Sequence, residues 1–226
     1  VAWVDCMATG EALGRSIVTF GEHSDDGIFA PMLKTRWNVP FNMPNFIMNK
    51  HSVKAFNQMY YSTHGSRFRE KSVHYDSFFY PLDRVNNWNR LYGSRGFIQY
   101  QFVVPTGDAF SSVKEILELT AALKIGSYLA VLKELGPGNE NYLSFPKGGI
   151  TLSLDFKVTR SLFSLLDHFD RIICSKGGRV YLAKDSRMSE TTFKHGYPDW
   201  GRFVAIRERY GAHKVFHSLQ SKRIGI

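Results

Sequence analysis

Six polar side chains occur inside segments that otherwise have the composition of buried strands. Lys184 ends the apolar run of GGRVYLAKDS (residues 177–186), and Lys133 interrupts SYLAVLKEL (residues 127–135). Two further strand-like segments carry two amides and two hydroxyls, at Gln99, Gln101, Thr151 and Ser153. If these segments form one sheet, the amines, amides and hydroxyls face the same way, as a floor that can bind a ligand. The alternative is that this side of the sheet is polar only because it faces water.

The strands needed to position this floor are predicted within residues 96–184. Two segments alternate apolar and polar residues, which is typical of a strand with two different faces. Two shorter apolar runs bounded by glycine or polar residues are consistent with further strands. The four predicted strands are residues 96–105, 127–135, 149–158 and 179–185.

Two helices are predicted between these strands, because apolar residues recur at helical spacing in 112–123 and 161–178. The first is expected to begin with a capping box of Ser112 and Glu115 and to end at Gly126. The order strand, helix, strand, strand, helix, strand predicts an α+β fold with a ferredoxin-like βαββαβ antiparallel sheet. Both helices then cover one side of the sheet and leave the floor on the other.

Residues 1–95 are less regular. Strands are expected at 1–7 and 15–20, and a helix at 45–61. Residues 81–95 are polar and bounded by Pro81 and Gly96, so we expect a mobile loop over the mouth of the site.

Composition sets wider limits. The 226 residues allow one large domain or one domain plus part of another, and 43% hydrophobic residues are typical of a globular protein. The net charge of +9 favours an anionic partner, which includes phosphate groups, nucleic acids and acidic membrane surfaces. Cys6 and Cys174 lack metal-ligand spacing, so both are expected to be free and no metal site is predicted. The sequence starts with neither an initiator methionine nor a signal peptide or other leader, and we expect a piece of a longer protein.

Several linked motifs resemble one enzyme family. GFIQYQFVVP, LKELGPGN, LSFP and YLAKDSR, with VAWVD near the start and YPDWGRFVAIRERYG near the end, are similar to the C-terminal half of FAD-dependent oxidoreductases of the vanillyl-alcohol oxidase type. The resemblance implies that residues 1–178 are the substrate (cap) domain and that 179–226 are the C-terminal segment of the FAD-binding domain. The rest of that domain would lie upstream, so the fragment alone is expected to be inactive and without FAD.

The activity that the resemblance implies is oxidation of a CH–OH group of a sugar, with hydride transfer to the flavin N5. An ammonium group would stabilise the negative charge that develops on the flavin. The resemblance assigns Lys184 to catalysis and flavin binding and Tyr181 to flavin binding. It assigns the substrate to Gln99, Gln101, Lys133, Ser153 and Phe79.

The sequence departs from the family where Ser153 replaces a thiol and Phe79 replaces a tyrosine, which leaves the exact sugar and its lipid carrier open. By the same resemblance the substrate is a small-molecule or lipid-linked sugar, such as a polyprenyl-phosphate pentose used in cell envelope biosynthesis. The resemblance also implies a partner reductase of the short-chain dehydrogenase type.

A cytoplasmic location is expected, and a periplasmic one stays open. Peripheral contact with an anionic membrane would use an aromatic and basic cluster. The cluster comprises Phe41, Met43, Phe46, Ile47, Met48, Lys50 and Lys54.

A ferredoxin-like RNA-binding module is the alternative function, because SRGFIQYQF resembles the RNP1 motif of RNA-recognition domains. Gln99, however, occupies a position where RNP1 needs a stacking ring, and the motif falls on the first strand rather than the third. We therefore expect no nucleic-acid partner.

Overall fold

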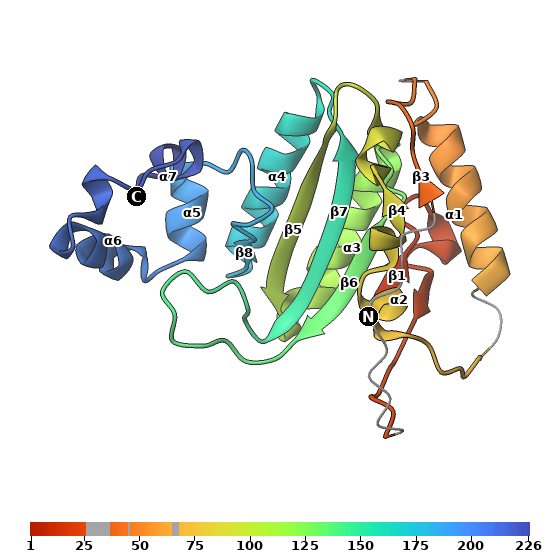
Figure 1. Ribbon diagram of the computed structural model, residues 1–226, viewed down its shortest axis with the longest axis horizontal. Helices are drawn as coiled ribbons and strands as arrows, with labels where there is room; N and C mark the ends of the chain where they lie inside the picture. Colours follow the sequence, from red (N-terminus) through yellow and green to blue (C-terminus); the bar gives the residue numbers. More distant parts are fainter. Residues whose placement is uncertain (26–36, 45, 65–67) are drawn as a thin grey trace.

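A computed structural model describes residues 1–25, 37–44, 46–64 and 68–226. Six strands form one sheet in the order β2-β1-β6-β7-β5-β8, and each strand is antiparallel to its neighbours (Figure 1). The strands are β1 (Ala2–Val4), β2 (Ser16–Val18), β5 (Phe97–Pro105), β6 (Ala130–Leu135), β7 (Gly149–Lys157) and β8 (Arg179–Val180). The predicted combination of helices with an antiparallel sheet is confirmed.

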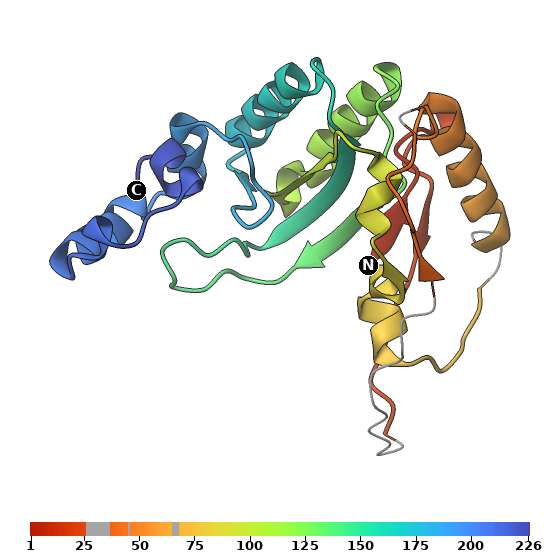
Figure 2. The same cartoon turned by 45° about the horizontal axis from the view of Figure 1, so that its top comes forward.

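Two long helices cover one side of this sheet (Figure 2). They are α3 (Thr106–Ala122), between β5 and β6, and α4 (Leu162–Ser175), between β7 and β8. The ring of Phe169 in α4 contacts Tyr100 of β5 and Phe156 of β7. The even-numbered residues of β5 and β7 therefore face the helices, as the alternation in the sequence predicted. They form the core with Phe102, Leu152 and Leu154, all 0% exposed.

The sheet is larger than the predicted four strands. Strand β1 pairs with β6 through Ala2 and Trp3, and β2 pairs with β1. The sequence indicated both strands but not that they extend the sheet, because pairing between distant segments leaves no local pattern.

Helix α3 begins at Thr106, six residues before the predicted start, so the predicted capping box is wrong. Ser112 is 1% exposed inside the helix, and its hydroxyl donates to the carbonyl of Asp108 at 2.8 Å. The predicted stop at Gly126 is also wrong, because the helix ends at Ala122. A Cβ at Gly126 would lie 2.5 Å from the sulfur of Met7, so close packing explains this glycine.

Strand β8 is shorter than the predicted 179–185, and Lys184 lies in a turn instead of a strand. The backbone N–H groups of Lys184 and Asp185 donate to the carbonyls of Tyr181 and Leu182 at 3.1 and 3.2 Å. The Asp185 carboxylate accepts from the backbone N–H of Met188 at 2.7 Å. This local hydrogen bonding favours a turn over continued strand pairing.

The N-terminal half forms a second group of elements beside β1. The helix predicted at 45–61 is observed as α1 (Lys50–His64), while residue 45 lies outside the described residues. Two short strands pair in parallel as a separate sheet. The remaining elements are β3 (Trp37–Asn38), β4 (Val85–Asn86), α2 (Tyr75–Phe79) and the 3-10 helices η1 (Gly10–Ala12), η2 (Pro81–Arg84) and η3 (Trp88–Tyr92).

The mobile loop predicted at 81–95 is wrong for most of its length, because η2, β4 and η3 occupy 81–92. Tyr92 is 3% exposed, and its ring stacks on Phe97 at a centroid distance of 4.5 Å. This segment therefore packs against one end of β5.

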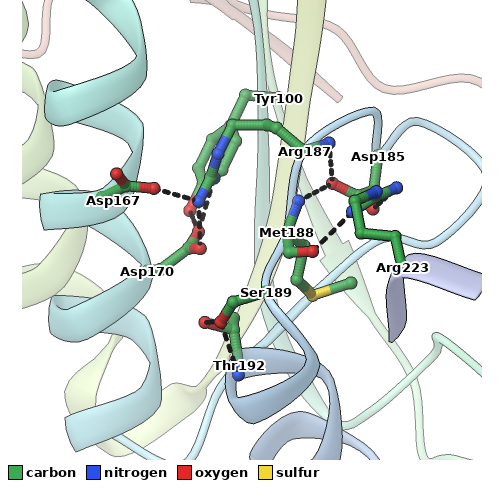
Figure 3. A network of polar contacts seen from close by, with 9 residues as sticks. All are labelled: Tyr100, Asp167, Asp170, Asp185, Arg187, Met188, Ser189, Thr192 and Arg223. Carbon is green, nitrogen blue, oxygen red and sulfur yellow. Dashed lines mark hydrogen bonds and ion pairs between the residues drawn. The ribbon is translucent and has the colours of Figure 1, made fainter. Parts of the chain in front are cut away.

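The C-terminal helices extend away from the sheet (Figure 1). They are α5 (Glu190–Gly196), α6 (Trp200–Arg209), the 3-10 helix η4 (Ala212–Lys214) and α7 (Leu219–Ile224). Figure 3 shows the polar contacts near their start: Arg187, which precedes α5, binds Asp170 of α4, and Arg223 of α7 binds Asp185 in the segment after β8. The division into 1–178 and 179–226 stays a prediction.

Candidate active site

The side of the sheet opposite α3 and α4 is here called the open face. Strand register decides which residues it carries, because partners directly opposite each other point to the same side. Gln101 lies opposite Ser153, and Lys133 lies opposite Thr151. Gln99 lies opposite Asp155. The amides, the hydroxyls and one amine of the predicted floor therefore share one face.

The floor is more enclosed than the solvent-exposed face of an ordinary sheet. Thr151 is 1% exposed, and its hydroxyl accepts a hydrogen bond from the Gln101 side chain at 3.2 Å. Gln99, Gln101 and Ser153 are half-buried, and Lys133 is exposed. Part of the floor is thus already packed by protein, while the rest is accessible to a ligand.

Lys184 reaches the same region from the turn after β8. The backbone N–H of Tyr181 donates to the carbonyl of Gln101 at 2.8 Å, and the N–H of Lys184 donates to the carbonyl of Tyr181 at 3.1 Å, so this turn lies beside the part of β5 that carries Gln99 and Gln101. In line with this position, the positive charge of Lys184 lowers the pKa of the Asp155 carboxyl. Lys184 and Lys133 are both exposed. Within the part of the chain that the structure describes, neither lysine forms an ion pair within 4.0 Å. Both amines are therefore available to an anionic group.

Tyr181 and Phe79 differ in their relation to the floor. The backbone N–H of Tyr181 donates to the carbonyl of Gln101 at 2.8 Å, and its ring stacks on Phe145 at 4.3 Å. Phe79 is 55% exposed in α2, and its ring contacts Phe78 and Tyr80. Among the described residues, no hydrogen bond or ring contact joins Phe79 to the floor.

Asp155 is the polar residue that sequence reasoning missed. It is 0% exposed, and burial raises the pKa of its carboxyl to about 6, although the Gln99 amide, the Lys184 charge and the Tyr92 hydroxyl act in the opposite direction. Neither carboxylate oxygen has a well-aligned hydrogen-bond partner among the described residues. Asp155 comes two residues after Ser153 in TLSLDF, so strand alternation puts it on the open face. Nothing in the sequence indicates that Tyr92 lies over it.

A second group of cations lies at the β8 edge of the sheet. The Lys147 ammonium donates to the carbonyl of Gly177, and the Arg179 guanidinium donates to the carbonyl of Ser144, both at 2.7 Å. Burial, followed by the nearby charge of Arg179, lowers the pKa of Lys147. Arg179 lies opposite Val103, on the open-face side. Two neighbouring cations at this edge favour an anion there.

The surroundings of Phe97 show whether the RNP1-like segment could serve as an RNA-binding surface. Its ring stacks on Tyr92 at 4.5 Å and contacts Trp88 at 5.2 Å. The next aromatic residues of β5, Tyr100 and Phe102, are buried on the helix side. The aromatic rings of the RNP1-like segment are therefore engaged in internal packing instead of being presented to stack on bases.

Other classes of site were also sought in the described residues. The two cysteines are free, with Cys6 buried and Cys174 half-buried. No group of three or more histidine, cysteine, aspartate or glutamate side chains there could hold a metal ion. No helix in the described residues combines the length and hydrophobicity needed to cross a bilayer.

Comparison with known proteins supports the resemblance seen in the motifs. No protein-family model matches the chain. The chain is 35% identical, over 99% of its length, to the decaprenylphosphoryl-beta-D-ribose oxidase of Mycolicibacterium smegmatis, and spans 50% of that protein. It is 25% identical, over its whole length, to an uncharacterized protein from the mprA 5' region of Streptomyces coelicolor, and spans 65% of that protein. The predicted resemblance to an oxidase of this kind is confirmed.

Proposed function

We propose that this chain is the substrate-binding part of an FAD-linked oxidoreductase that oxidises a secondary alcohol of a polyprenyl-phosphate pentose. It would correspond to the C-terminal half of such an oxidase, by its similarity to the decaprenylphosphoryl-beta-D-ribose oxidase. One observation carries the proposal. The residues that the resemblance assigned to the substrate, Gln99, Gln101, Lys133 and Ser153, are brought onto one face by strand register.

We further infer that β5, α3, β6, β7, α4 and β8 form a ferredoxin-like unit. The strand order β6-β7-β5-β8 and the position of both helices on one side support this reading. In such a unit the open face is the natural place for a ligand, because the helices fill the other face. Strands β1 and β2 are then additions at the β6 edge.

The floor can recognise a sugar through hydrogen bonds in a partly enclosed setting. The Gln101 amide nitrogen is held by Thr151, which leaves its carbonyl oxygen to accept from a sugar hydroxyl. Gln99 and Ser153 add further donors and acceptors. A polar group left unpaired in such a place costs about 1 to 3 kcal/mol, so a ligand lacking the matching hydroxyl is bound less well.

Lys184 fits a position beside a flavin. Its ammonium is exposed, and no acidic group among the described residues pairs with it at short distance. FAD, when bound, supplies the hydride acceptor. Lys184 and Tyr181 would hold it, with the ammonium stabilising negative charge on the ring system. Residues 1–178 would act as the substrate domain and 179–226 as the end of the FAD domain, so this piece alone would lack the activity.

The phosphate and lipid parts of the substrate have their own candidate contacts. Phosphate groups can bind to Lys133, or to Lys147 and Arg179 at the sheet edge. Phe41 and Phe46 are 61% and 76% exposed, and with the exposed Lys50 they provide a contact with an anionic membrane surface. Met48 is 6% exposed, so this residue of the predicted membrane cluster belongs to the core.

We also propose a reductase of the short-chain dehydrogenase type as partner, since oxidation of a secondary alcohol leaves a ketone, which such an enzyme can reduce. This proposal rests on the family resemblance.

The test of the proposed function is flavin reduction by substrate in the full-length, flavin-bound protein. We expect Lys184→Met to keep FAD bound but to abolish rapid anaerobic reduction of the flavin, followed by its absorbance. The matched control is Lys176→Met, which removes a lysine paired with Asp108 near the helix-covered side. Reduction of the Lys184→Met protein at the wild-type rate would contradict the assigned role.

A further inference from the structure

The buried aspartates of this chain differ in how well their charge is compensated. Among the described residues, three aspartates whose side chains are at most 4% exposed have short hydrogen bonds to arginine side chains, and the buried Asp76 lies 3.3 Å from the ring of His74. Asp5 accepts from Arg15 at 2.6 Å, Asp170 from Arg187 at 2.6 Å, and Asp185 from Arg223 at 2.8 Å. In each case the partner explains why a carboxylate is tolerated inside the protein.

Asp155 has no such partner. Among the described residues, no donor makes a well-aligned hydrogen bond to either of its carboxylate oxygens, although the side chain is completely buried. Polar groups from three elements surround it. Gln99 of β5 lies directly opposite, and Tyr92 of η3 stacks on β5 through Phe97. Lys184 lies in the turn that the Tyr181–Gln101 backbone hydrogen bond holds beside β5, and all three groups lower the pKa of the carboxyl. Of these, only Lys184 carries a positive charge.

Burying a carboxylate without a paired cation is unfavourable, and an asparagine of the same shape would avoid the cost. Structural demands alone therefore do not account for an acid at this position. The acid lies directly across from Gln99, on the face that carries the proposed substrate residues. Its charge is thus placed where it can act on a neighbouring functional group.

We propose that Asp155 is a positioning residue, whose carboxylate attracts the ammonium of Lys184 and holds it over the open face. This inference rests on the proposed function, in which Lys184 lies beside the flavin. The attraction exists only when the carboxyl is ionised, so it weakens when the carboxyl takes up a proton. Because burial raises the pKa of Asp155 to about 6, the loss occurs as the pH falls through that value.

The first test uses the full-length, flavin-bound protein and follows the carboxyl carbon of Asp155 by NMR during a pH titration. We expect its pKa to lie near 6 and to rise in Lys184→Met, because that variant removes the positive charge that opposes the effect of burial. Lys133→Met is the matched control, since this exposed lysine lies opposite Thr151. Titration at the value of a free aspartate, or an unchanged pKa in Lys184→Met, would overturn the proposal.

The second test uses the full-length, flavin-bound enzyme and the variant Asp155→Asn. For the wild type, we expect the rate of flavin reduction to fall by up to about tenfold per pH unit below pH 6. The variant should reduce more slowly at neutral pH and lose this dependence, with its KM for substrate little changed.

The two tests separate this inference from the proposed function. If Lys184→Met abolishes flavin reduction while Asp155→Asn keeps the wild-type pH profile, the positioning role is wrong and the proposed function stands. If Lys184→Met leaves reduction intact, the proposed function itself fails, whatever the titration of Asp155 shows.

Discussion

Buried acidic side chains on the two faces of the central sheet differ in whether a cation compensates their charge. On the helix-covered face, Asp170 accepts from the Tyr100 hydroxyl at 2.8 Å and from Arg187 at 2.6 Å (Figure 3). On the open face, Asp155 is equally buried but forms no ion pair within 4.0 Å among the described residues, and the hydrogen-bonding side chains next to it, Gln99 and Tyr92, are neutral. The covered face is therefore built to stabilise the fold. The open face retains uncompensated polarity, which is typical of sites that bind or transform a ligand.

The largest expected effect on stability is on the covered face. Arg187→Met leaves the Asp170 carboxylate buried without its cation, so we expect the free energy of unfolding to fall by about 3 to 5 kcal/mol. Urea denaturation measures this change. Lys176→Met is the control, because its ion pair with Asp108 is solvent-exposed and should contribute at most about 1 kcal/mol. Equal effects of the two variants would remove the contrast between the faces.

On the open face, we expect Asp155→Asn to stabilise the fold at neutral pH. The pKa of Asp155 rises from 3.8 to about 6 on folding, so ionisation of the buried carboxyl opposes the folded state. This cost is absent below about pH 4 and complete above about pH 6, where it reaches about 3 kcal/mol at most. Urea denaturation of both proteins at several pH values measures the difference. Destabilisation at neutral pH, or a gain independent of pH, would argue that Asp155 has a stabilising partner.

The smallest expected effects come from neighbouring residues of β5 that point to opposite faces. Tyr100→Phe removes a buried hydroxyl bonded to Asp170, and we expect a loss of about 1 to 2 kcal/mol in the free energy of unfolding. Gln101→Leu on the open face should change it by less than about 0.5 kcal/mol, because the side chain is half-buried and its main contact is one neutral hydrogen bond. A larger loss for Gln101→Leu would indicate that the open face also serves stability.

The sequence predicted which residues share a face, because alternation along β5 and β7 fixes side-chain direction once the strands pair. The boundaries were less predictable. Ser112 and Glu115 have the spacing of a capping box, yet helix α3 starts earlier, directly after Pro105. The length of β8 was overestimated, because its apolar composition does not reveal the turn that Asp185 stabilises with Met188.

The environment of Asp155 could not be predicted for a different reason. Its polar neighbours Tyr92 and Lys184 come from segments more than 25 residues away, and neither segment has a periodic pattern. Burial of an acid depends on such tertiary contacts, which a single sequence does not record. The site residues found from the sequence are accordingly those placed by regular strands.

The central claim, that the open face binds the substrate, is tested most directly by thiol protection. In the full-length, flavin-bound protein, Ser153→Cys places a thiol on the floor and Lys176→Cys places one at the end of α4 near the helix-covered side. Alkylation of each variant is followed by mass spectrometry with and without a polyprenyl-phosphate pentose. We predict that substrate slows labelling of the floor thiol at least about tenfold, equivalent to about 1.4 kcal/mol, and leaves the control unchanged. Equal labelling of the floor thiol with and without substrate would contradict the claim.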